Sequence, residues 1–302
     1  MTELMVEISE KYPDVYFIPG QRDGKYPYSH SLLLNDTLID TGISSGFLRK
    51  LNRKVPINTV ILSHWHEDHI SGNRILPNVH YMAHSEDIPI IENVEKMYEF
   101  YHVPEDATQR DLFETILQGL KLEDVSVNTQ ISDNDLLNIN DKYQLRVIHT
   151  PGHTMGHCCF YEERSKIAFL ADIDLSGLGP WYGCKDSDVI KFEESIDKMK
   201  KLDIEIAISS HKGIFHGSNE IQEKLQAYQE KIYERDEKIL EMLSEKTPKD
   251  SKDLSRKNIV YPRYSEYEIY EILAERIMIE SHFNKLRQEG KIRQKNDGFI
   301  LS

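Results

Sequence analysis

One apolar run, NTVILSH at residues 58–64, constrains the fold of this 302-residue chain more than any other segment. The run is too continuously apolar for a half-exposed strand, so it predicts a strand that is buried on both faces. Strands of this kind lie in sheets whose faces are covered by helices. The run ends at His64, which places a histidine at the carboxyl end of a buried strand. Functional sites of α/β proteins are commonly built at such strand ends.

Further apolar runs alternate with helical patterns along the first two thirds of the chain. Strands are predicted at residues 15–20, 29–36, 37–42, 79–84, 143–152, 157–163, 166–174 and 204–211. Helical periodicity is predicted within residues 86–123, 187–202 and 218–243. This alternation, followed by a helical tail, predicts an α/β sandwich with a small helical C-terminal domain.

The character of the chain changes at Ser218, so we predict a catalytic domain over residues 1–217 and an extension over residues 218–302. The extension begins with the long helical pattern and continues into a polar, linker-like stretch at residues 244–258. Two helical segments follow. The final GKIRQKNDGFIL predicts a two-stranded hairpin with its turn at Asn296, Asp297 and Gly298. The extension is therefore winged-helix-like.

Histidines and aspartates recur where the predicted strands end. His64, His66, Asp68 and His69 crowd into the single loop SHWHEDHISG, and His153, Asp172 and His211 follow later strands. Imidazole and carboxylate groups bind Zn and Fe, and a site for two metals needs ligands around both ions and a bridging group. A histidine-rich solvated turn would explain the first loop alone, but it would not explain the recurrence. The seven side chains therefore predict a two-metal centre.

These motifs resemble those of the metallo-beta-lactamase superfamily. HWHEDH is similar to its H-x-H-x-D-H signature, HTPGHTMGH to its second histidine motif, and LIDTG to its upstream aspartate motif. The later aspartate and the last histidine also fall in the expected order, so the resemblance covers roughly residues 15–215. It implies a four-layer αβ/βα sandwich with a binuclear metal centre at one edge.

The resemblance also implies a role for each side chain. The first metal would be held by His64, His66 and His153, and the second by Asp68, His69 and His211, with Asp172 as the bridge. Asp40 would lie behind these ligands and fix the loop that carries them. The last histidine stands in SSHKG, whereas the superfamily usually has glycine before it. This departure leaves the ligand intact and makes its loop unusual.

For other residues near these motifs, the sequence predicts a position or a role less specifically. Trp181 and Tyr182 follow Asp172 in the chain, and they either line a substrate pocket or pack beneath a loop. Cys158 and Cys159 are expected in the core. We see no base to activate Cys184. Histidines outside the motifs are expected in loops or at the surface.

The composition indicates which kinds of partner and which cellular compartment to expect. A net charge of −14 disfavours a general nucleic-acid binder, which needs a basic surface. Three cysteines, two of them adjacent, do not form a disulfide framework. The first residues lack the pattern of a secretory signal, and no apolar stretch approaches the roughly 20 residues that span a bilayer. We therefore expect a soluble, cytoplasmic protein that acts on a small molecule; its oligomeric state is not indicated.

The expected activity is hydrolysis by a metal-bound hydroxide, with two divalent ions (Zn, or Fe or Mn) as cofactors. Asp68 is expected to orient the hydroxide besides binding metal. HTPGHT resembles the corresponding stretch of glyoxalase-II-type thioesterases, and the helical extension is similar to that of thioesterase-like members. A small thioester or ester is therefore the leading substrate class.

Two other activities remain open. The first is a nuclease or phosphodiesterase, because some beta-lactamase-like ribonucleases carry a similar C-terminal domain. Its phosphate contacts would come from a basic face made by Lys285, Arg287, Lys291, Arg293 and Lys295. A solvated helix and hairpin that cap the active site are the favoured alternative for that face. The second is an iron-dependent dioxygenase on the same fold.

Overall fold

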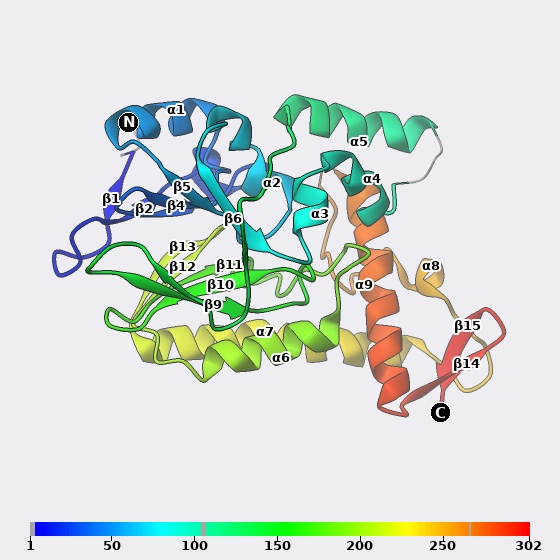
Figure 1. The fold of residues 1–302 in the computed structure, drawn as a ribbon. Coiled ribbons are helices and arrows are strands. Elements are labelled where there is room, and N and C mark those ends of the chain that lie inside the picture. The colour runs from blue at the N-terminus through cyan, green and yellow to red at the C-terminus, as the bar shows by residue number, and fades with distance from the viewer. Residues whose placement is uncertain (1–3, 104–106, 266) are drawn as a thin grey trace.

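The computed structural model describes residues 4–103, 107–265 and 267–302, and within these ranges the chain forms two large sheets that face each other (Figure 1). The first sheet runs in the order β1 (Val6–Glu7), β2 (Val15–Ile18), β3 (Ser31–Leu34), β4 (Thr37–Ile39), β5 (Thr59–Ile61), β6 (His80–His84) and β7 (Thr129–Ile131). The second runs in the order β13 (Gly213–His216), β12 (Ile206–Ser209), β11 (Ile167–Ala171), β10 (Cys158–Glu162), β9 (Gln144–His149) and β8 (Leu136–Asn138). Both sheets mix parallel and antiparallel pairs.

Helices cover the outer faces of both sheets. The described part of the chain forms α1 (Ser45–Lys54), α2 (Glu67–Ile70), α3 (Ile88–Ile91), α4 (Met97–Phe100), α5 (Ala107–Leu120), α6 (Val189–Lys200), α7 (Ser218–Met242), α8 (Ser251–Leu254) and α9 (Glu268–Gln288). Short 3-10 turns lie at Gln21–Gly24, Asn73–Ile75 and Val94–Lys96. Figure 1 shows α1 outside the first sheet, α6 and α7 outside the second, and α9 across one end.

Three apolar cores lie between the four layers of helices and sheets and hold them together. The layer between the sheets contains Phe17 of β2 and Phe160 of β10. A second layer lies outside the first sheet and includes Leu48 of α1, and a third lies outside the second sheet and includes Phe192 of α6. Each sheet is therefore covered on both faces, and the predicted four-layer αβ/βα sandwich is confirmed.

The apolar run at residues 58–64 is explained by the position of β5. This strand pairs in parallel with β4 and with β6, so it lies inside the first sheet. Val60 packs into the layer outside that sheet, while Ile61 packs into the layer between the sheets. Successive side chains of a strand point to opposite faces, so a strand covered on both sides needs apolar residues at every position.

The extension packs against the sandwich instead of standing apart from it. Ile232 of α7 and Phe283 of α9 belong to the same apolar layer as Phe192 of α6. Arg235 interrupts the apolar stripe of α7 in the sequence, but it is buried and donates hydrogen bonds to the carbonyls of Leu178 and Pro180. The division of the chain at residue 217 stays a prediction.

The predicted C-terminal hairpin is confirmed as β14 (Ile292–Lys295) paired antiparallel with β15 (Gly298–Leu301). Its turn holds Asn296 in the left-handed region, with a φ of 53°, a conformation that asparagine tolerates well. Within the described residues, every helix falls short of the combined length and apolar character that a membrane crossing requires. The cytoplasmic location stays a prediction.

Candidate metal centre

The structure brings the seven side chains predicted as ligands to one edge of the sandwich. They come from the loop after β5 and the short α2, and from the loops that follow β9, β11 and β12. They form three overlapping groups, namely His64, His66 and His153; His64, His69 and Asp172; and Asp68, His69 and His211. In each group the potential ligand atoms, one from each residue, lie within 4.8 Å of one another.

Asp172 occupies the centre of this cluster. Its Oδ1 lies 3.0 Å from Nε2 of His69. Its Oδ2 lies 3.2 Å from Nε2 of His153 and 3.3 Å from Nε2 of His211. One carboxylate therefore faces imidazoles that belong to different groups.

The donor atoms of this cluster suit a divalent cation. His69 Nε2, His153 Nε2 and Asp172 Oδ1 are buried, and none of them has a well-oriented hydrogen bond to a described residue. Buried polar atoms are almost always hydrogen-bonded, so three such atoms facing one another point to a missing partner. Imidazole and carboxylate are ligands for Zn, Fe and Mn, so the residues fit the predicted kind of metal.

The charges in the cluster also suit a cation. Burial holds the pKa of His64 and of His66 well below the usual range, so both imidazoles are neutral, as metal ligands must be. Burial alone would raise the pKa of Asp172, but the imidazoles of His69 and His211 outweigh it and hold that pKa well below its usual value. Burial alone would lower the pKa of His211, but the Asp172 carboxylate outweighs it and raises that pKa to about 9. Protons on the imidazoles thus supply positive charge that a bound cation would provide.

Each of the five imidazoles also has a partner at the ring nitrogen that faces away from the cluster. The pairs are His64 Nδ1 with Ser63 Oγ at 2.9 Å, His69 Nδ1 with Asp40 Oδ2 at 2.8 Å, His153 Nδ1 with the Trp181 carbonyl at 2.8 Å, His211 Nδ1 with the Gly24 carbonyl at 2.7 Å, and His66 Nε2 with Cys184 Sγ at 3.3 Å. Such contacts fix the tautomer and the orientation of metal-binding histidines.

The structure places Asp40 directly behind the first histidine loop. Its carboxylate accepts hydrogen bonds from the backbone N–H of Ser63 at 2.8 Å and from the Ser63 hydroxyl at 2.7 Å. Gly42 lies two residues later, and a Cβ at this position would lie 1.6 Å from the carbonyl oxygen of Asp68. The LIDTG segment thus has one residue that holds the loop and another that lets it approach closely.

The structure separates Trp181 from Tyr182. The half-buried Trp181 ring lies 5.5 Å from the His66 ring, measured between centroids, so it borders the cluster. Tyr182 is fully buried, and its hydroxyl contacts His282 at 2.7 Å and Arg235 at 2.9 Å. The prediction that Tyr182 lines a pocket is therefore wrong. Tyr182 instead packs in the core outside the second sheet.

Two buried carboxylates near the cluster were not expected from the sequence. Glu67, between two predicted ligands, accepts hydrogen bonds from the hydroxyls of Tyr26 and Tyr101. Asp87 accepts hydrogen bonds from Trp65 and from the second histidine motif. Neither residue has a spacing signal, because its partners lie far away in the chain.

Of the histidines outside the motifs, His30 lies in a loop, as expected, although it is buried. His84 ends β6 and His282 lies in α9, and both are buried, so the expectation of a loop or surface position is wrong for these two. Cys158 and Cys159 are in the core, as predicted. Cys184 does contact an imidazole, contrary to expectation, but burial and nearby carboxylates raise the pKa of its thiol well above the usual range. The thiol is therefore neutral at physiological pH, which does not suit a nucleophile.

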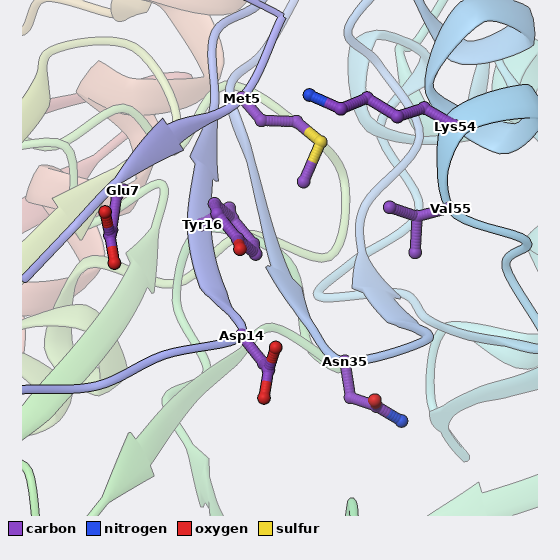
Figure 2. A pocket seen from close by; sticks show the side chains of 7 residues that line it. All are labelled: Met5, Glu7, Asp14, Tyr16, Asn35, Lys54 and Val55. Carbon is purple, nitrogen blue, oxygen red and sulfur yellow. The ribbon is translucent and has the colours of Figure 1, made fainter. Parts of the chain in front are cut away.

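A separate hollow of about 420 Å³ lies beside β1 and β2 (Figure 2). It is lined by Met5, Glu7, Asp14, Tyr16, Asn35, Lys54 and Val55. Asn35 precedes β4, whereas the metal-ligand cluster lies beyond the other end of that strand. The hollow therefore shares no residue with the cluster.

Comparison with known proteins agrees with this fold. Residues 35–211 match the sequence profile of the metallo-beta-lactamase superfamily, and the chain belongs to this superfamily. A metallo-beta-lactamase family protein from Thermus thermophilus superimposes with a TM-score of 0.72 at 20% identity, covering 96% of this chain and 99% of that one. At this identity the likeness shows the fold.

The matching relatives differ in how much of their length is covered. A beta-lactamase-like protein 2 homolog from Drosophila melanogaster is 24% identical over 241 residues, or 80% of this chain and 72% of that protein. A hydroxyacylglutathione hydrolase from Chelativorans sp. is 35% identical over 83 residues, or 27% of this chain and 31% of that protein. The match thus spans about a third of that hydrolase, and about a third of an uncharacterized protein from Aquifex aeolicus.

Proposed function

We propose that this protein is a hydrolase that uses two divalent metal ions, Zn or Fe or Mn, to cleave a small thioester or ester. The first ion would be held by His64, His66 and His153, and the second by Asp68, His69 and His211. The observation that carries the proposal is the position of Asp172, whose two oxygens face imidazoles of both sets. A carboxylate placed in this way would help to hold both ions, as a two-metal site requires.

The protein's own residues hold the reacting groups in place. When bound, two divalent ions supply Lewis-acid activation of water and of the scissile carbonyl at neutral pH. Asp68 lies at the edge of the cluster, with Oδ2 3.5 Å from Nε2 of His211 and Oδ1 3.9 Å from Nε2 of His69. We assign it the orientation of the attacking water. The outward contacts of the five imidazoles keep the ligands from rotating, so the site is preorganised.

A small thioester is the favoured substrate class. A thiolate leaves without a general acid, whereas a ribose or amine leaving group needs one. The relatives that match part of the chain include proteins named hydroxyacylglutathione hydrolase, and the HTPGHT stretch supports the same reaction. The net charge of −14 suits a small molecule better than a nucleic acid.

The nuclease alternative is weakened by the surroundings of the predicted basic face. Lys285 is 5% exposed, and its ammonium group contacts Asp236 at 2.6 Å and Glu193 at 3.1 Å. Lys291 pairs with Glu289 at 2.7 Å. Two of the five cations are therefore neutralised by carboxylates of the protein itself, and Lys285 does not reach the surface.

We expect metal-loaded protein to hydrolyse acyl thioesters and to leave single-stranded RNA intact, because Lys285 and Lys291 of the predicted basic face are paired with carboxylates of the protein. The measurement is kcat/KM on a panel of acyl thioesters and on an RNA oligonucleotide, with one preparation. Chelation should abolish the thioesterase activity, and separate reloading with Zn, Mn or Fe identifies the effective metal.

RNA cleavage that is lost when Lys291 and Arg293 are both reversed in charge would contradict the thioesterase proposal and make the protein a nuclease. If both substrates stay intact, oxygen uptake by iron-loaded protein would instead support the dioxygenase alternative. Thioester turnover that survives complete removal of metal would contradict the metal centre itself.

The extension contributes an aromatic wall to the site. The Tyr270 ring on α9 lies 5.5 Å from the Tyr101 ring and 6.3 Å from the Trp181 ring, measured between centroids. Trp181 in turn borders His66. Trp181 and Tyr270 are half-buried, so part of this wall remains accessible. We propose that the apolar part of the substrate packs against it.

Tyr270→Ala should therefore raise KM about tenfold and leave kcat within about threefold, because it removes apolar contact area but no ligand. Tyr270→Phe keeps the ring and should behave like the wild type. Tyr233→Ala is the matched control, since Tyr233 lies on α7 with its hydroxyl bound to Glu193. Steady-state kinetics on the best thioester provides both constants. A loss confined to kcat would argue against a wall that binds substrate.

A further inference from the structure

His66 differs from the other four imidazoles of the cluster in two respects. It faces the cluster with Nδ1, which lies 3.1 Å from Nε2 of His64, whereas His69, His153 and His211 face it with Nε2. Its outward nitrogen is also the one that meets sulfur, the Sγ of Cys184 at 3.3 Å, where the other four meet oxygen.

The segment that carries Cys184 is held on both sides of this contact. The backbone N–H of Lys185 donates to the carbonyl of Phe100 at 2.8 Å. The Ser187 hydroxyl donates to the carbonyl of His153 at 2.7 Å and accepts a hydrogen bond from the Cys184 N–H at 3.1 Å. Cys184 itself is fully buried. The thiol is thus fixed against the His66 ring, and it is tied to the motif that supplies another predicted ligand of the same metal.

We infer that Cys184 is a positioning residue for His66 and through it for the first metal ion, an inference that rests on the proposed metal centre. An imidazole that binds metal through Nδ1 keeps its proton on Nε2, and that N–H donates to Sγ. The contact selects this tautomer and sets the angle of the ring. A thiol sulfur is a weak acceptor, so His66 has the weakest outward hydrogen bond of the five histidines.

The test compares three variants in the full chain. Cys184→Ala removes the acceptor, Cys184→Ser keeps an acceptor, and Cys158→Ala removes the sulfur of an equally buried cysteine whose thiol donates to the carbonyl of Gly156. Metal affinity is measured by competition with a chelator, and the visible spectrum of the cobalt-loaded protein reports on ligand geometry without any substrate. Thermal unfolding of the metal-free variants checks that each one folds.

We expect Cys184→Ala to weaken one of the two metal sites by about 10- to 100-fold and to change the cobalt spectrum. Cys184→Ser should stay within about fivefold of the wild type, and Cys158→Ala should match it. Equal affinities and spectra for the Cys184→Ala and Cys158→Ala proteins would overturn the inference while leaving the metal centre intact. A Cys184→Ser protein as impaired as Cys184→Ala would also overturn it. Wild-type protein that binds no metal would overturn the proposed function together with this inference.

Discussion

Asp172→Ala should lower kcat/KM for the best thioester by about 10³-fold or more and leave the fold intact. The carboxylate faces imidazoles of both ligand sets, so its loss removes the group that joins them. Correctly held ions contribute several kcal/mol to such a reaction, which corresponds to a factor of about 10³. The measurements are kcat/KM and metal content by elemental analysis, with circular dichroism as the check on folding.

Asp174→Ala is the matched control for this change. Asp174 lies two residues away in the same loop and accepts a hydrogen bond from the Ser176 N–H, but it belongs to none of the three groups of potential ligands. It should retain activity and both metal ions. Full activity in a metal-stripped Asp172→Ala protein would rule out the assigned site.

Asp87→Ala should lower the free energy of unfolding by about 3 to 5 kcal/mol, in metal-free protein as well. The Asp87 carboxylate accepts hydrogen bonds from the Trp65 N–H at 3.0 Å, the Thr154 hydroxyl at 2.9 Å and the Gly156 N–H at 2.7 Å. Burial and the neighbouring Asp186 raise its pKa, so the ionised form depends on these donors. Alanine would leave three buried donors without a partner. Chemical denaturation measures the difference.

Glu86→Ala provides the comparison, because Glu86 is the exposed neighbour of Asp87 in the same loop. It should change stability by less than about 0.5 kcal/mol. Asp87 links the backbone at Trp65, in the first histidine motif, to Gly156 in the second. Loss of metal affinity should therefore accompany the loss of stability, and an Asp87→Ala protein as stable as Glu86→Ala would show that the link does not matter.

Much of the fold and of the predicted ligand set followed from the sequence, for local reasons. A strand covered on both faces needs apolar residues at every position, so NTVILSH indicated a buried strand and where it ends. The helix over Ser218–Met242 and the C-terminal hairpin depend on periodicity and on turn residues, which are also local. The ligand types recur at strand ends, so the chemistry of the cluster was visible before its geometry.

The partners of those residues were decided by the tertiary structure alone. Cys184 meets His66 across 118 positions of the chain, and Asp87 meets Gly156 across 69. Tyr182 and Trp181 are neighbours in the sequence, yet one is packed in the core and the other borders the ligand cluster. The sequence predicted Lys285 to be a surface cation, but α7 places Asp236 beside it. The spacing of residues in the sequence encodes the period of a helix or a strand. Contacts between distant segments depend on how the layers pack, and such contacts leave no periodic pattern in the sequence.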